Sequence, residues 1–231
     1  MPAETSPNTD MESLDYDSID MEQLSLSISV WAAELGFQQL GIADIDLSKH
    51  EEYLDRWLQA GYHGEMDYMQ KHGSKRSHPE QLVDDTCRVI SVRMDYLTDQ
   101  ARPAVELLQE DEEALISRYA LGRDYHKVIR GKLKKIWQQI EAYLEEHQLA
   151  PAQGRVFTDS APVLEKPIAV KGGLGWMGRD TNILSREAGS WFFLGEIYTD
   201  LPLPVDSPVT KHCDSCSACI DICPTNAIIA P

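Results

Sequence analysis

The chain has 231 residues, of which 42% are hydrophobic and 8% aromatic, so it can form one packed domain together with a small second module. This composition excludes a wholly disordered protein. The net charge of −17 disfavours nucleic acid as a partner when taken alone, because contacts to phosphates need clustered cations. No apolar run reaches the length of about 18 residues that a membrane-spanning helix requires.

The N-terminal region is polar and acidic. Its lack of periodicity predicts a disordered tail over residues 1–20. Residues 1–22 contain seven acids and no Lys or Arg, so the rest of the chain is less acidic than the total suggests, and net charge leaves the choice of partner open. Neither the basic nor the apolar region of a secretory signal is present, so we expect a cytoplasmic protein without a membrane partner.

Helix and strand patterns alternate along the first half of the chain. Apolar residues recur at helical spacing until a glycine interrupts them, and a later segment alternates apolar with polar residues as a strand does. The expected elements are a helix from Met21 to Gly36, a strand over 37–45, a helix over 51–60 that ends at Gly61, and a strand over 87–96.

The longest helical pattern covers residues 124–147 and combines an apolar face with a cationic band. The simplest interpretation of the band is a solvated face, although no other segment is as well suited to meet a phosphate backbone. The apolar set is Val128, Leu133, Ile136, Trp137, Ile140 and Leu144, and the band is Lys127, Arg130, Lys132, Lys134 and Lys135. Strands are expected over 155–159 and 191–198, and the proline-rich segment 201–208 predicts a linker, with a domain boundary near residue 205.

Four of the five cysteines have the spacing C-x2-C-x2-C-x3-C-P: Cys213, Cys216, Cys219 and Cys223. In ferredoxin-type modules the first three cysteines of such a run bind one 4Fe–4S cluster and the fourth binds another. Zinc is the main alternative, but its cysteine pairs are usually a dozen or more residues apart, and thiols without a metal are a further alternative. The spacing therefore predicts iron–sulfur clusters.

Neither cluster has a complete set of ligands in this sequence. The first three cysteines need a fourth ligand to complete one cluster, and Cys223 needs three further ligands to complete the other. Cys87 lies in a predicted strand, where a core position is expected. We therefore expect a fragment of a longer protein. A cluster shared between chains is the less favoured alternative.

Three other features have competing interpretations. Residues 173–178 match G-x-G-x-x-G, but a helical pattern precedes them and an extended one follows, which favours turn packing or close approach to another cofactor over dinucleotide binding. Asp159 follows a predicted strand and is either a proton donor or, as the local pattern favours, a helix N-cap. His126 could bind a metal or transfer protons, but a lone histidine on a helix is more often a surface or packing residue.

Eight stretches of the sequence together resemble the epoxyqueuosine reductases, the cobalamin- and iron–sulfur-dependent enzymes of queuosine synthesis in tRNA. The resemblance extends from about Met21 to Ile229, and the wider group of corrinoid iron–sulfur reductases includes the reductive dehalogenases. The matching stretches are AAELGFQQLGIADIDL, GYHGEMDYMQKHGSKR, RVISVRMDYL, SRYALGRDYHKVIRGKLKK, FTDSAPVLEKPIA, GGLGWMG, REAGSWFFLGEI and CDSCSACIDICPTNAI.

The resemblance implies an α+β fold. A corrinoid-binding, nitroreductase-like domain is expected over 21–204 and the first half of a ferredoxin-type module over 205–231, with its second half and the C-terminal helical repeats absent. It makes Asp159 the proton donor in place of a cap. It also implies that Asp159, Arg76, Ser117, Asn182, Ile183 and Leu194 lie at the corrinoid, and that Cys213, Cys216, Cys219 and Cys223 bind the clusters.

The activity implied by the resemblance is the reduction of epoxyqueuosine to queuosine at the wobble position of tRNA. This reaction consumes two electrons and two protons and releases water, so a low-potential electron donor is expected beside the tRNA substrate. A monomer is expected. The alternatives are a dehalogenase-like corrinoid reductase, a non-enzymatic electron carrier and an inactive fragment, and cobalamin binding separates the first from the second.

Overall fold

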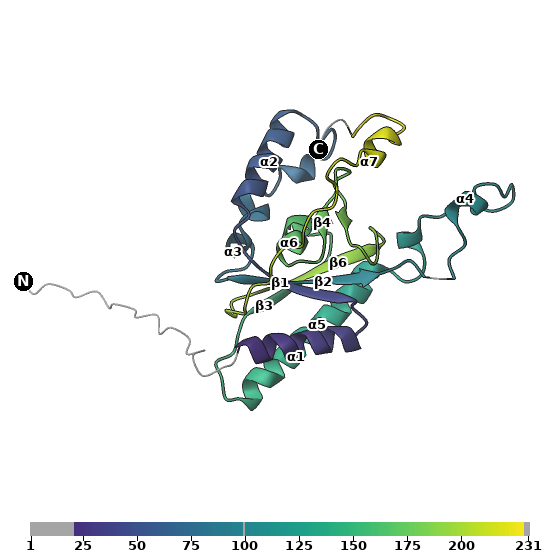
Figure 1. Ribbon diagram of the computed structural model, residues 1–231. Helices are drawn as coiled ribbons and strands as arrows, with labels where there is room; N and C mark the ends of the chain where they lie inside the picture. Colours follow the sequence, from purple (N-terminus) through teal and green to yellow (C-terminus); the bar gives the residue numbers. More distant parts are fainter. Residues whose placement is uncertain (1–20, 99, 229–231) are drawn as a thin grey trace, which may run out of the picture.

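The computed structural model describes residues 21–98 and 100–228, and the expected tail at residues 1–20 lies outside the described residues. A four-stranded antiparallel sheet with the order β1-β2-β6-β3 forms its centre (Figure 1). The strands are β1 (Gln39–Asp44), β2 (Arg88–Asp95), β6 (Phe192–Thr199) and β3 (Gly154–Phe157). Each agrees with a strand expected from the sequence, and the helices packed on the sheet confirm the α+β fold.

Helices α1 (Met21–Glu34) and α5 (Tyr125–Glu146) cover one face of the sheet (Figure 1). Their apolar sides meet those of the strands in the main core, as helical periodicity predicted. One detail differs, because Ile129 rather than Val128 is the buried residue of the first turns of α5. The core residues on α5 are Ile129, Leu133, Ile136, Trp137, Ile140 and Leu144. In the cationic band only Lys132 is half-buried, so the band is chiefly a solvated face.

The opposite face is covered by α6 (Glu165–Lys171), which lies over β1, β2 and β6. Because both faces are covered, the polar side of β2 is buried as well, with Ser91 and Arg93 almost inaccessible. Arg93 forms ion pairs with Asp95 at 3.0 Å and Glu187 at 3.3 Å, so its charge is compensated inside the fold.

Shorter elements surround these layers. A small hairpin of β4 (Trp176–Met177) and β5 (Ile183–Leu184) follows α6. The remaining elements are α2 (Ser48–Gln59), η1 (Asp67–Met69), η2 (Gly73–Arg76), α3 (Pro79–Leu82), α4 (Ala104–Leu107), η3 (Arg118–Ala120) and α7 (Ala218–Asp221). The expected helix at 51–60 is confirmed, with its start three residues earlier.

The proline-rich segment 201–208 has no regular structure but packs firmly on the sheet. Leu201 and Leu203 are fully buried. Asp206 donates its backbone N–H to the carbonyl of Ile42 at 2.9 Å, and its carboxylate accepts the Ile42 N–H at 2.8 Å. These two bonds occupy the outer edge of β1, which protects an otherwise open strand.

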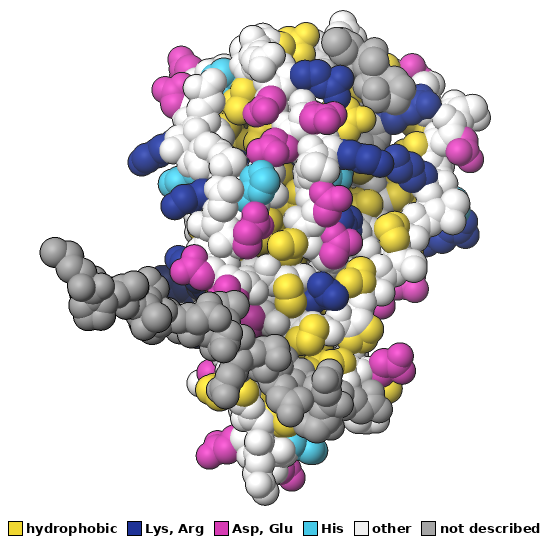
Figure 2. All heavy atoms as spheres, turned by 90° about the vertical axis from the view of Figure 1, so that its left-hand side faces the viewer, with side chains coloured by type: hydrophobic (Ala, Val, Ile, Leu, Met, Phe, Trp, Pro, Cys, Tyr) yellow, Lys and Arg dark blue, Asp and Glu magenta, His cyan; other side chains and the backbone are white. Residues whose placement is uncertain are grey.

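The surface carries charges of both signs. On the face shown in Figure 2, acidic and basic side chains are intermixed and do not form a continuous patch of one sign. Among the described residues, no helix has the length and apolar character needed to cross a membrane.

Substitution of Gly41 by alanine is expected to destabilise the fold by about 1–3 kcal/mol. A Cβ at this position would lie 1.8 Å from the carbonyl oxygen of Gly172, so the backbone after α6 would have to move. In the matched control, Gly131→Ala on α5, the new Cβ meets no atom within 4 Å, and the helix gains about 1 kcal/mol. Urea unfolding measures the difference, and equal midpoints for the two variants would contradict the close contact.

Candidate active site

Asp159 lies in the turn after β3, and its carboxylate contacts two side chains of α5. Its φ of +56° is a left-handed conformation that non-glycine residues rarely adopt. The hydroxyl of Tyr125 donates to the Asp159 carboxylate, and Nε2 of His126 lies 3.3 Å from the same oxygen. Both partners belong to the first turn of α5, so the start of this helix fixes the carboxylate.

The orientation of His126 is fixed from its other side. Asp124 is the N-cap of α5, and its carboxylate accepts the backbone N–H of His126 at 3.0 Å. The same carboxylate oxygen lies 3.0 Å from Nδ1 of the ring, so the ring bridges Asp124 and Asp159. His126 also stacks on the Tyr125 ring with centroids 4.0 Å apart, so its packing role and a role in proton transfer both remain predictions.

The interpretation of Asp159 as a helix N-cap is wrong. The next helix, α6, begins six residues later at Glu165, and its N-cap residue is Leu164, without a side-chain cap. The Asp159 carboxylate instead faces Tyr125 and His126.

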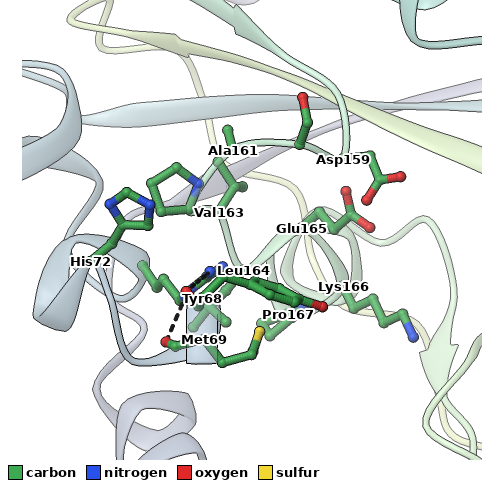
Figure 3. Close-up of a pocket in the computed structure, with 13 residues that line it drawn as sticks. Tyr68, Met69, His72, Asp159, Ala161, Val163, Leu164, Glu165, Lys166 and Pro167 are labelled. Carbon is green, nitrogen blue, oxygen red and sulfur yellow. Dashed lines mark hydrogen bonds between the residues drawn. The ribbon is translucent and has the colours of Figure 1, made fainter. Parts of the chain in front are cut away.

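Two cavities meet at Asp159. The larger has a volume of about 710 Å³ and the smaller about 160 Å³, and both are lined by Asp159, Glu165 and Lys166. Figure 3 shows the larger cavity, in which the carboxyl groups of Asp159 and Glu165 point toward one another. Its remaining lining is largely apolar: Met69, Ala161, Pro162, Val163, Leu164 and Pro167.

Burial shifts the proton affinity of the groups around Asp159. The pKa of Tyr125 is raised by burial and by its hydrogen bond to Asp159, so the phenol keeps its proton. The pKa of Glu165 is raised to about 7, first by burial and then by the negative charge of Asp159. Complete burial raises the pKa of Glu196 well above its ordinary value, and the charges of Glu165 and Asp159 act in the same direction.

The structure brings most of the predicted corrinoid residues to these cavities. Asn182, Ile183 and Leu194 line the smaller cavity. Arg76 lines the larger one from η2, where its buried guanidinium donates to the carbonyls of Tyr68 at 2.9 Å and Met69 at 3.2 Å. Ser117 is exposed before η3 and lines neither cavity.

The four clustered cysteines lie on the C-terminal segment, and all have free thiols. Within residues 21–98 and 100–228, no three His, Cys, Asp or Glu side chains are grouped closely enough to hold a metal. The donor chemistry nevertheless fits, because hydrogen bonds from the Ile228 backbone and from Thr225 lower the pKa of Cys223 to about 7 and favour the thiolate. Cys87 lies apart and half-buried, 3.2 Å from the carbonyl oxygen of Asp200.

Comparison with known proteins agrees with this arrangement. The family model "Epoxyqueuosine reductase QueG, DUF1730" matches residues 76–160, and the model "4Fe-4S binding domain" matches residues 209–229. Curated epoxyqueuosine reductases from Pseudomonas aeruginosa and Escherichia coli are 56% and 51% identical to this chain, each over 92% of its length. The chain belongs to the epoxyqueuosine reductase family. It covers 57% and 55% of those two proteins, so it spans little more than half of their length.

Solved structures share the fold. The epoxyqueuosine reductase of Streptococcus thermophilus matches with a TM-score of 0.72 at 26% identity, over 89% of this chain and 53% of that one. An epoxyqueuosine reductase solved with an epoxyqueuosine-modified tRNA stem loop gives a TM-score of 0.76 at 24% identity, over 90% of this chain and 54% of that one. A reductive dehalogenase described in connection with B12-dependent dehalogenation gives 0.56 at 15% identity, over 96% of this chain and 27% of that one.

The glycine-rich motif is packed in a turn, which is one of the two interpretations that the sequence favoured over dinucleotide binding. A Cβ on Gly175 would lie 2.3 Å from the carbonyl oxygen of Leu184, and one on Gly173 would lie 2.7 Å from that of Ser207. The motif contains β4, and a turn instead of a helix follows it.

Sequence reasoning missed three residues at or beside the candidate site. Glu165 and Lys166 open α6 in the stretch FTDSAPVLEKP, only six and seven residues after Asp159. Glu196 interrupts the apolar stretch WFFLGEIY. A single acid between apolar strand residues is a pattern that can point to a buried functional group.

Glu165 is expected to make the protein less stable as the pH rises from about 4.5 to about 7. The pKa of Glu165 is raised from 4.5 to about 7 by folding, so within this window the folded state binds more protons than the unfolded chain. The free energy of unfolding then falls with rising pH and levels off above the window, where both states have lost the proton.

Glu165→Gln is expected to reduce this fall by up to about 3 kcal/mol, at about 1.4 kcal/mol per pKa unit. The exposed control Glu112→Gln is expected to leave it unchanged. Urea unfolding midpoints across the window measure both effects. An equal fall in the wild type and in Glu165→Gln would show that folding does not raise the pKa of Glu165.

Proposed function

We propose that this chain forms the corrinoid-binding and proton-donating part of an enzyme that reduces epoxyqueuosine in tRNA to queuosine. The observation that carries the proposal is the Asp159 carboxylate, held by Tyr125 and His126 where two cavities meet. The names of the relatives, together with the tRNA stem loop solved with one of them, support this substrate. A low-potential donor supplies the electrons.

The residues around the cavities fit a corrinoid. The larger cavity offers an apolar floor to a flat macrocycle, and the buried Arg76 lies at its wall. Asn182, Ile183 and Leu194 would line the other side, and Ser117 would have to approach from its exposed loop. A reduced corrinoid supplies a strongly nucleophilic metal centre.

The protein's own contribution is to supply and hold a proton. Opening the epoxide leaves negative charge on oxygen, and the carboxyl group of Asp159 can protonate it when it carries a proton. The Tyr125 hydroxyl and the His126 ring fix the direction of that carboxyl, and Asp124 fixes the ring. The Asp159 side chain is 55% exposed, so solvent can return the proton after donation.

The cysteines would hold the iron–sulfur clusters that deliver electrons one at a time. Cys213, Cys216 and Cys219 would bind one cluster, and Cys223 would contribute to a second. The remaining cluster ligands would come from outside residues 213–223. Cys87 is not placed to serve, since its thiol is hydrogen-bonded to the backbone carbonyl of Asp200. The match of residues 209–229 to a 4Fe–4S binding domain supports this assignment.

Two other functions are less well supported. A dehalogenase-like reductase shares the fold, but its sequence identity is only 15%, against 56% for an epoxyqueuosine reductase. An electron carrier would need the cysteine segment alone, and this leaves the Asp159 site and its cavities without a role.

Anaerobic titration of the chain with cobalamin tests the proposal. A saturable shift of the cobalamin absorption spectrum is expected. Ala161→Trp is expected to weaken it because the indole would fill the larger cavity, whereas Ala104→Trp on exposed α4 serves as the matched control. Absence of any shift with folded protein would overturn the corrinoid assignment.

Asp159→Ala is expected to lower the turnover of the enzyme that carries both cofactors by about 10²–10⁴-fold, the usual contribution of general acid catalysis. Cobalamin binding is expected to remain, since the substitution only shortens one side chain at the cavity wall. Mass spectrometry of nucleosides from digested tRNA measures the product. Single-turnover reduction at the wild-type rate would exclude Asp159 as the proton donor.

A further inference from the structure

The proposed reaction needs more protons than one carboxyl group can give. Both carbon–oxygen bonds of the epoxide break, a carbon–carbon double bond forms, and the oxygen leaves as water. The balance is epoxide plus two electrons plus two protons giving alkene plus water, with the electrons supplied by the low-potential donor. Asp159 provides one proton, and a second acid close to it can provide the other.

Glu165 has the position required of that second source. It is the first residue of α6 and lines both cavities together with Asp159. Its carboxyl group also accepts a hydrogen bond from the backbone N–H of Asp159. The two carboxyl groups point toward one another in Figure 3, so both can reach an oxygen placed between them.

Glu196 lies behind this pair on β6. It follows Leu194 on the same face of the strand, because side chains alternate, and Leu194 lines the smaller cavity. Two residues along a strand correspond to about 7 Å, so Glu196 is one step deeper than the cavity wall. It is fully buried, and neither of its carboxyl oxygens has a hydrogen-bond partner among the described residues.

A buried carboxyl group without partners is far more stable in its neutral, protonated form. The groups facing Glu196 do not compensate a charge, since they are the acids Asp159 and Glu165 and the phenol Tyr198 of its own strand. The nearby cations act on Glu165 instead, where Lys166 and His126 favour its charged form.

We propose that Asp159 and Glu165 form a proton-supply chain, in which Glu165 donates the second proton of the reduction while Glu196 behind it stays neutral. This inference rests on the proposed function. Glu165 has a pKa of about 7, so about half of the molecules hold this proton in neutral solution and can give it to an oxyanion. After donation, the carboxylate of Glu165 recovers a proton from solvent through the cavities that it lines, because Glu196 is fully buried without hydrogen-bond partners and keeps its own proton.

Infrared spectroscopy of the cofactor-free chain tests the protonation of Glu165 and Glu196 directly, because the C=O band of a protonated carboxyl group is separate from the carboxylate bands. One such band is expected to persist at about pH 8 and to be absent from Glu196→Gln. A second is expected to disappear near pH 7 and to be absent from Glu165→Gln. Glu112→Gln, an exposed control, is expected to keep both.

Loss of all protonated carboxyl signals from the wild type by about pH 8 would overturn the proposal, even if Glu196→Gln failed to fold. Persistence of the high-pH band in folded Glu196→Gln would overturn it as well.

Single-turnover rates of the enzyme carrying both cofactors test the chemical role. Glu165→Gln is expected to slow product formation about a hundredfold and to remove the ionisation near pH 7 from the rate profile. Glu196→Gln keeps a neutral side chain of similar shape and is expected to retain the wild-type rate profile. A wild-type rate and profile in Glu165→Gln would overturn its role as the second donor.

Failure of this inference is distinguishable from failure of the proposed function. If the chain binds no cobalamin, the proposed function fails whatever the infrared spectra show. If cobalamin binds and Asp159→Ala is inactive, but Glu165→Gln has the wild-type rate and profile, only the proton-supply chain is excluded.

Discussion

The close packing of α5 on the sheet decides where the chemistry of this chain takes place. Gly195 makes it possible, because a Cβ there would lie 2.7 Å from the side chain of Ile129 on the helix. The side chains of α5 therefore pack directly on the strand backbone, and the first turn of α5 reaches the end of β3. Tyr125 and His126 meet Asp159 only because of this approach, since 33 or more residues separate them in sequence.

Strand β6 contributes to stability on one face and to the site on the other. Toward α5 it presents Ile197 to the main core. Toward α6 it presents Leu194 to the smaller cavity and Glu196 to the buried interior behind it. An unpartnered buried carboxyl group costs folding free energy that an apolar residue would not, and such violations of packing rules are expected at functional sites. The central strand therefore trades some stability for a protonated group next to the site.

The sequence predicted the scaffold better than the site. The helical spacing of apolar residues and their alternation in strands depend only on residues close in sequence. The positions of α1, α5, β2 and β6 therefore follow from local patterns alone. The role of Asp159 could not be derived locally, because a cap and a proton donor share the same strand-end context, and the partner that distinguishes them comes from α5. Only the resemblance to the family predicted the proton-donor role. Glu165 and Glu196 were missed because their significance lies in mutual proximity and burial, which no single stretch of sequence records.

The loop after β4 connects the two ends of the proposed electron path. Asn182 from this loop lines the smaller cavity, and Arg179, three residues earlier, donates to the carbonyl of Asp214 at 2.7 Å within the cysteine segment. The ring of His212 packs edge-on against Trp176 of β4 with centroids 5.0 Å apart, directly before the first cysteine of the cluster. These two contacts hold the start of the cysteine segment against the loop and hairpin that also line the smaller cavity, so the predicted cluster ligands and the Asp159 site are joined through one short stretch of chain.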